Sequence, residues 1–170
     1  ASREAVELRA AWRTETTDAY IGVAYIGDDL ADGTSGNSTV LEGGVTQRLF
    51  DNKLELSAAS SIALTDTNSV DLPARHGISA RYAVSNNVRL VGTYEIARGD
   101  AIDANTLKGG VEFTPWNGAT VVSMLGRDTV GNEALGEDSD RTFAAFTIGQ
   151  SLRVGENLVL DATIDTNKTI

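Results

Sequence analysis

Apolar and polar residues alternate with a period of two along most of this chain. In the last such segment, one side carries Leu, Ala and Ile while the other carries Asp and Thr (Leu158, Leu160, Ala162 and Ile164 against Asp161, Thr163 and Asp165). The same alternation runs through 53–64, 78–84 and 88–96, and it is weaker over 19–27. A period of two is typical of strands with one apolar face. The pattern therefore predicts an all-β, antiparallel sheet of about ten strands.

Two kinds of connection separate the expected strands. Tight turns are expected at 14–18, 51–52, 85–87, 117–118 and 155–157. Longer, acidic loops are expected at 28–38, 66–73, 98–105 and 128–140. The two kinds alternate, which predicts an up-and-down sheet with turns at one end and surface-exposed loops at the other. That asymmetry is typical of transmembrane β-barrels.

An internal repeat supports this strand register. The sequence Leu-Glu-Gly-Gly-Val at 41–45 recurs as Leu-Lys-Gly-Gly-Val at 107–111, and each copy leads into a tight turn. Similar units at a fixed spacing indicate a sheet built from hairpins. Paired glycines inside strands favour bends that let a sheet curve.

Composition excludes several classes of protein. The chain has 170 residues, which fits one domain over 1–170, and no run of apolar residues long enough for a membrane helix. Its formal net charge of -10 makes nucleic acid an unsuitable partner. Cysteine is absent, so disulfides, thiolate metal sites and cysteine nucleophiles are excluded.

Three features favour lipid, rather than a dry core, against the apolar face. That face is built mainly of Leu, Val, Ile, Ala and Gly, which fill a wide interior poorly. The polar face carries charges of both signs, and we expect them to line a hydrated lumen. These lumen-lining candidates are Glu42, Arg48, Arg81, Arg89, Glu95, Lys108, Glu112, Arg127, Asp161 and Asp165.

The third feature is that aromatic residues lie near strand ends. Such bands are typical of the membrane–water interface. The expected interfacial aromatics near the tight turns are Trp12, Tyr20, Phe50, Tyr82, Phe113 and Trp116, and those toward the loops are Tyr25, Tyr94, Phe143 and Phe146.

Several segments resemble outer-membrane β-barrels of Gram-negative bacteria. They are the hairpin 47–56, the Phe-Thr-Pro-Trp-Asn-Gly-Ala turn at 113–119 and the closing run 150–161. More narrowly, residues 40–170 resemble the C-terminal barrel region of large repeat-containing surface proteins. The resemblance implies a bacterial outer-membrane location, turns facing the periplasm, and the lipid bilayer and lipopolysaccharide as partners. Other parts of a parent polypeptide and envelope proteins are further expected partners.

The chain ends differently from that family. Its last residues are Asn-Lys-Thr-Ile rather than a closing aromatic, and the predicted topology puts both ends on the loop side. We therefore expect a barrel fragment, with about 12 strands or more in the whole barrel. The expected function is a non-catalytic membrane anchor or scaffold, or a narrow, porin-like passive channel.

No catalytic or metal-binding constellation stands out. The single histidine, His76, could be combined with Ser79 and Asp71 into a catalytic group, but nothing in the sequence fixes their geometry. We expect His76 to be a strand-end residue without catalytic function. Acidic residues cluster in the loops, but their spacing does not match an EF-hand, so we expect solvated loop tips, with weak cation binding as the alternative. We expect no enzyme activity, cofactor or metal. The alternative is a soluble β-barrel or sandwich that binds a small apolar ligand or acts as an adhesion module.

Overall fold

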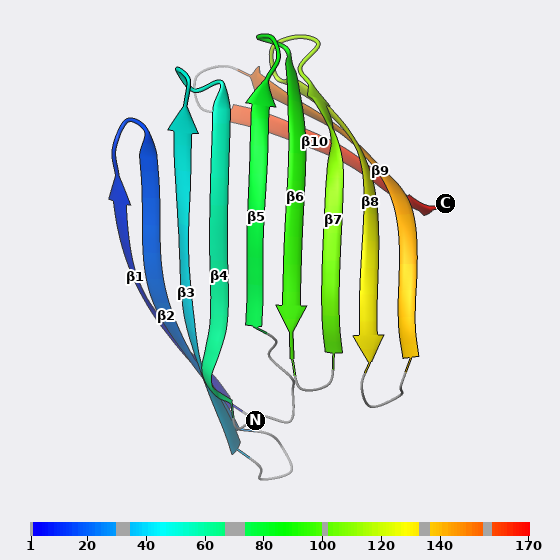
Figure 1. Ribbon diagram of the computed structural model, residues 1–170. Helices are drawn as coiled ribbons and strands as arrows, with labels where there is room; N and C mark the ends of the chain where they lie inside the picture. Colours follow the sequence, from blue (N-terminus) through cyan, green and yellow to red (C-terminus); the bar gives the residue numbers. More distant parts are fainter. Residues whose placement is uncertain (1, 30–34, 67–73, 100–101, 133–136, 155–157) are drawn as a thin grey trace.

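The chain folds into one antiparallel sheet (Figure 1). The computed structural model describes residues 2–29, 35–66, 74–99, 102–132, 137–154 and 158–170. Within them the strands are β1 (Ser2–Arg13), β2 (Thr17–Asp29), β3 (Ser35–Leu49), β4 (Leu54–Asp66), β5 (Ala74–Ala83), β6 (Val88–Arg98), β7 (Ile102–Phe113), β8 (Ala119–Asn132), β9 (Glu137–Val154) and β10 (Leu158–Thr169).

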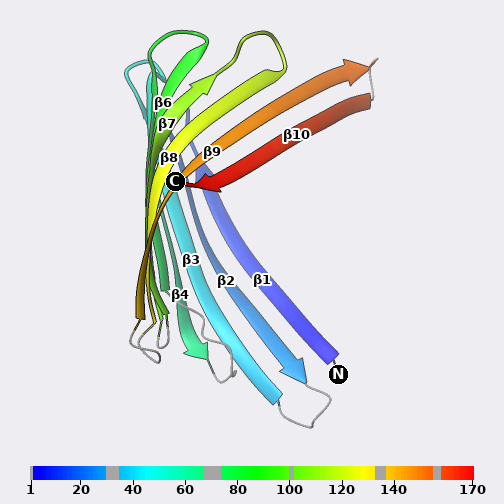
Figure 2. The same cartoon turned by 90° about the vertical axis from the view of Figure 1, so that its right-hand side faces the viewer.

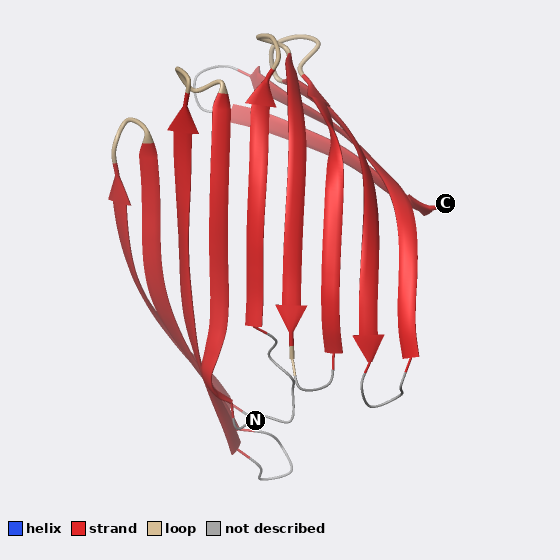
Figure 3. Cartoon of the chain, viewed as in Figure 1, coloured by secondary structure: helices blue, strands red, loops and turns tan. Residues whose placement is uncertain are grey.

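The predicted all-β, up-and-down architecture is confirmed. The ten strands are hydrogen-bonded in chain order, and the weakly alternating segment 19–27 lies within β2. The described part of the chain contains strands and turns but no helix, and so no helix long and apolar enough to cross a membrane (Figure 3). The sheet is not closed, because β1 and β10 are edge strands with no pairing between them among the described residues.

The prediction of long loops is wrong for three of the four connections. Residues 30–34, 99–101 and 133–136 separate the strands there and are about as few as in the turns, whereas the connection 67–73 agrees with the predicted 66–73 to within one residue. The hairpin of β8 and β9 shows the reason: it stays paired up to Asn132 and Glu137, well inside the predicted loop 128–140. Side chains such as Thr129 and Val130 favour extended backbone, and ladder hydrogen bonds outweigh the acidic composition there.

The sheet is strongly curved. Figure 2 shows β1 to β3 and β9 to β10 bending toward the same side of the central strands, so that one face is concave and the other convex. A right-handed twist and glycine positions allow this curvature.

Strand register sorts the side chains into two continuous faces. Cross-strand partners lie on the same face, and successive residues point to opposite faces. Row by row, Leu8 lies opposite Val23, Val23 opposite Leu41, and Leu41 opposite Ile62. We call this side the apolar face. The other side, which holds Glu42, Arg81 and Glu95, is called the polar face.

Glycines on the polar face lie opposite large side chains. Gly44 pairs with Tyr20 and Gly126 with Phe143, and a Cβ atom at either glycine would lie only 2.6 Å and 2.4 Å from the nearest ring carbon. Gly110 is the counterpart of Gly44 in the sequence repeat. A Cβ atom there would lie only 2.1 Å from the backbone oxygen of Ser123 on β8. The rings of Tyr20 and Phe143 therefore lie close over glycines of the neighbouring strands, where a Cβ atom would clash.

Candidate functional site

The candidate site is the polar face, and nearly all predicted lumen residues share it. Register places on it Glu42, Arg48, Arg81, Arg89, Glu95, Lys108, Glu112, Asp161 and Asp165. Arg127 does not belong with them, because it pairs across from Leu107 and Thr142 on the apolar face. The sequence of β8 hides this, since Val121, Val122, Met124 and Leu125 make both of its faces apolar.

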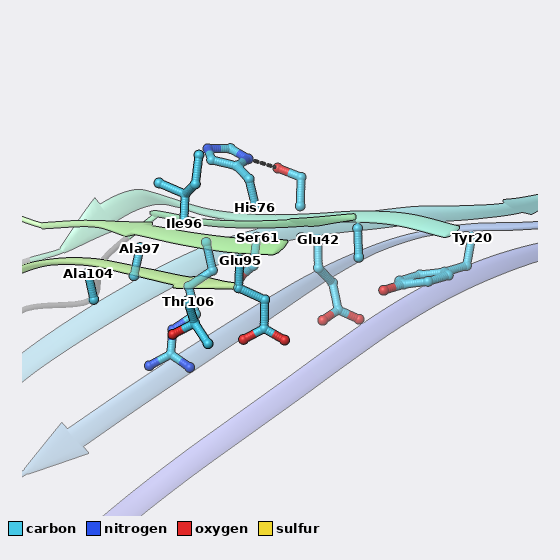
Figure 4. A pocket seen from close by; sticks show the side chains of 13 residues that line it. Tyr20, Glu42, Ser61, His76, Glu95, Ile96, Ala97, Ala104 and Thr106 are labelled. Carbon is cyan, nitrogen blue, oxygen red and sulfur yellow. Dashed lines mark hydrogen bonds between the residues drawn. The ribbon is translucent and has the colours of Figure 1, made fainter. Parts of the chain in front are cut away.

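The polar face is the concave one. In Figure 4, Glu42, Glu95 and Thr106 point toward the side to which β1 and β2 curve, while His76 and Ile96 point the opposite way. Together with Tyr20 and Arg75, the two glutamates border a hollow of about 500 Å³. Small residues such as Gly77 and Ala104 also line it. The central part of the concave face is therefore shallow and bordered by charges of both signs.

A ladder of ion pairs crosses the polar face near the turn end. Asp18 accepts from Arg13 at 2.8 Å and from Arg48 at 2.5 Å. Glu55 lies 3.5 Å from Arg48 and 3.7 Å from Arg81, and so continues the ladder from β3 to β5. A separate pair joins Arg89 to Glu112 at 2.8 Å. Each contact joins neighbouring strands, so the charges are neutralised along the wall of the sheet rather than across a space.

Aromatic residues gather at the turn end, mostly on the apolar side. Trp12, Tyr82 and Phe113 lie on the apolar face, and all three are exposed. The indole N–H of Trp116 donates to Gln150 at 2.8 Å, which holds this turn residue beside the same face. Phe50, in the turn between β3 and β4, is 70% exposed.

Tyr20, like Phe143, differs from the predicted interfacial aromatics that lie on the apolar face. It lies on the polar face, where its ring covers Gly44 and stacks under the guanidinium of Arg9 at 4.1 Å. The flanking residues Ala19 and Ile21 are both apolar, so alternation in the sequence does not reveal its side.

The apolar face is exposed. Leu8 is 78% exposed, Leu125 63% and Ile164 66%, and many other large apolar side chains of this face are similarly open. In the described part of the chain, the only buried hydrophobic residues are Ala119 and Phe143. This sheet therefore encloses no dry core of its own, whereas a stable soluble domain buries most of its large apolar residues.

Polar residues bound the apolar face at the loop end. Arg98 and Asp103 lie 3.8 Å apart, and Arg127 lies 2.5 Å from Asp140. Thr129 also donates to Asp140, at 2.7 Å. The apolar band thus has an aromatic limit at one end and a charged limit at the other.

The catalytic combination considered from the sequence does not form a site; its members are His76, Ser79 and Asp71. His76 lies on the apolar face and Ser79 on the polar face, while Asp71 lies outside the described residues. His76 instead shares a 2.9 Å hydrogen bond with Ser60, its cross-strand partner. That partnership depends on strand register, which the sequence of the 66–73 connection does not specify.

Several acidic residues of the predicted loops have cationic partners instead of forming a metal site. Among those described, Asp103, Asp128 and Asp140 pair with arginines, and no group of three or more potential metal ligands occurs in the described part of the chain. The side chains of Asp28, Asp29, Asp66, Glu137 and Asp138 lie outside the described side chains, and Asp32, Asp71, Asp100 and Glu133 outside the described residues.

No protein-family model matches the chain, and no curated protein sequence matches it.

Proposed function

We propose that this sheet is part of the wall of a β-barrel in a bacterial outer membrane. Its apolar, convex face contacts lipid and lipopolysaccharide, and its polar, concave face lines the lumen. The protein is then a non-catalytic anchor or scaffold, or a narrow passive channel.

The observation that carries the proposal is the pairing of two opposite surfaces on one curved sheet. The outside of the curve is a continuous apolar surface and the inside is a polar surface with ion pairs. A soluble barrel or sandwich has the reverse arrangement, with its apolar side chains packed inside. Lipid-facing and lumen-facing residues alternate in the proposed way along membrane barrel strands.

The limits of the apolar band add support. Trp12, Tyr82 and Phe113 lie at its turn end, where an interfacial aromatic girdle is expected. The ion pairs Arg98–Asp103 and Arg127–Asp140 lie at its other end. Charged side chains on a lipid-facing surface destabilise a barrel least when they lie near the membrane–water interface.

The proposal also sets a requirement. An open sheet edge leaves backbone groups unpaired, and hydrocarbon offers them no hydrogen bonds. In the membrane, the edges at β1 and β10 must therefore pair, with further strands or with each other. The ladder from Arg13 to Arg81 pairs charges of neighbouring strands along the wall, as suits side chains that line a hydrated lumen.

Site-directed spin labelling tests the orientation directly, because the chain has no cysteine to remove. Labels are placed at Leu125, on the apolar face, and at Thr163, on the polar face, in protein reconstituted into lipid vesicles. We expect oxygen to relax the label at 125 more strongly and a water-soluble nickel complex to relax the label at 163 more strongly. Equal access of the nickel complex to both labels, in protein that stays monodisperse without detergent, would favour the soluble alternative.

Planar-bilayer conductance then separates an anchor from a channel. A channel gives discrete conductance steps, and an anchor gives none at protein densities confirmed by labelling.

A further inference from the structure

A second hollow, of about 470 Å³, lies on the polar face at the turn end. Ala83, the last residue of β5, lines it, and we call it the Ala83 hollow. Its lining is Glu15, Arg48, Asn52, Lys53, Glu55, Arg81, Ala83 and Arg89. Arg48, Arg81 and Arg89 are predicted lumen-lining residues, and strand register brings Lys53 and Ala83 beside them.

Three cations occupy neighbouring positions of Ala83 in the sheet. Arg89 is its cross-strand partner on β6, and Arg81 precedes it by two residues on the same face. On the other side, the backbone N–H of Ala83 donates to the carbonyl of Lys53 at 2.7 Å. Two arginines and one lysine are thus neighbours of the small residue Ala83 in the sheet, and all three line the hollow with it.

The hollow has two carboxylates, Glu15 and Glu55, against four cationic side chains, so the cations are not fully neutralised. Glu55 is shared between Arg48 and Arg81, and its 3.7 Å separation from Arg81 is too long for a hydrogen bond. Arg89 uses one nitrogen for Glu112. No ion pair of Lys53 occurs within the described residues. The side chains of Arg81 and Arg89 are 54% and 51% exposed, so each retains free N–H donors.

We propose that the Ala83 hollow binds a phosphate group. Planar guanidinium groups donate pairs of parallel hydrogen bonds to phosphate oxygens, and a lysine adds a point charge. The chain has a net charge of -10, so the electrostatic potential around it is mostly negative. At the cationic hollow the potential is locally positive, and this attracts anions to the hollow. The phosphate belongs either to a dissolved anion or to a lipid headgroup. This site lies on the polar face, and its existence does not depend on the membrane proposal.

Titration of inorganic phosphate into the folded chain, followed by ³¹P NMR and calorimetry, tests the proposal. We expect saturable binding that weakens with added salt. Arg81→Gln and Arg89→Gln each remove charged hydrogen bonds and are expected to weaken binding about tenfold or more. Lys108→Gln is the matched control, because it removes a cation from the same face at a position outside the hollow. This variant is expected to bind phosphate like the parent chain.

Ala83→Glu is a second test that leaves all cations in place. Its carboxylate occupies the hollow and should abolish binding, while the strand signal in circular dichroism shows whether the sheet is retained. A parallel titration with short-chain phosphatidylglycerol separates the two sources of phosphate: binding of either probe supports the site and identifies its source. Absence of saturable binding to both, or equal weakening by Lys108→Gln, overturns the proposal.

Discussion

At the scale of single residues, the polar face depends on small residues placed beside large ones. Gly44 accommodates the ring of Tyr20, and Arg9 covers the other side of that ring. The sequence repeat points to Gly44, predicted as a bend that lets the sheet curve; the structure adds that its lack of a side chain leaves space for the ring. The repeat does not reveal that the ring belongs to the polar face, since β2 is apolar on both sides of Tyr20.

Gly44→Ala is expected to destabilise the sheet by about 1–3 kcal/mol, because the added Cβ lies 2.6 Å from a ring carbon of Tyr20. The neighbouring Gly43→Ala is the control, since its Cβ approaches no atom closer than 3.4 Å. The free energy of unfolding in urea measures both. If Gly43→Ala costs as much as Gly44→Ala, a general loss of backbone flexibility explains the effect, and steric contact with Tyr20 does not.

Asp140 provides a test that uses pH. It lies at the loop-end limit of the apolar face, beyond the band that we propose the bilayer covers. The hydroxyl of Thr129 and then the guanidinium of Arg127 lower the pKa of Asp140 below its usual 3.8. Because the pKa is lower in the folded state, this contribution to stability is present above pH 3.8 and is lost as the pH falls through the folded-state value.

Thr129→Val is therefore expected to raise the pKa of Asp140 toward 3.8, as followed by the ¹³C shift of its carboxyl group. Thr142→Val, on the same face opposite Arg127, is the control and should leave this pKa unchanged. An unchanged pKa in Thr129→Val would contradict the assigned hydrogen bond.

At the scale of elements, the strands follow from the sequence but their ends do not. Alternation and turn residues such as Asn117 and Gly118 locate the hairpins. Acidic composition was a poor guide to loop length, because Asp128, Asp140 and Arg141 extend the β8–β9 pairing through cross-strand ion pairs. Which face a residue occupies was predictable only where one face is apolar and the other polar. Arg127 fell in a strand without that contrast.

The turn between β3 and β4 makes its own prediction. Phe50, Asp51 and Asn52 all have positive φ angles, of 54°, 56° and 65°. Asn and Asp tolerate this region, whereas Phe does not. The turn therefore holds an exposed aromatic ring in a strained backbone conformation, as expected for a ring with a role at an interface.

Phe50→Gly and Phe50→Ala both remove the ring, but only glycine relieves the strain. The glycine variant is expected to be about 1 kcal/mol more stable than the alanine variant in the free energy of unfolding. Asn52→Gly should change stability by only a few tenths of that amount. Equal stabilities of the two Phe50 variants would show that the positive φ angle costs nothing in this turn.

At the scale of the whole molecule, the shape and the two faces belong together. The sheet is open, curved and apolar on its convex side. Many of its large apolar side chains are therefore exposed and are not covered by other described residues. The sequence predicted both faces from composition and period. The expectation that charged residues line a lumen also implies that the polar face is the concave one, and the sheet curves in that direction.

Leu125→Arg measures what covers the convex side. In lipid vesicles, we expect an arginine there to destabilise the fold by about 2–4 kcal/mol, because its charge lies in hydrocarbon. Thr163→Arg, on the polar face, should cost much less. If the two variants differ by less than 1 kcal/mol, water rather than lipid covers the apolar face.

The aromatic turn end has one practical consequence. Both tryptophans of the chain, Trp12 and Trp116, are exposed at that end. Intrinsic fluorescence of the unmodified protein therefore reports on one end of the sheet alone. An emission spectrum that stays constant during a titration carries no information about events near the opposite rim, and a reporter there has to be introduced.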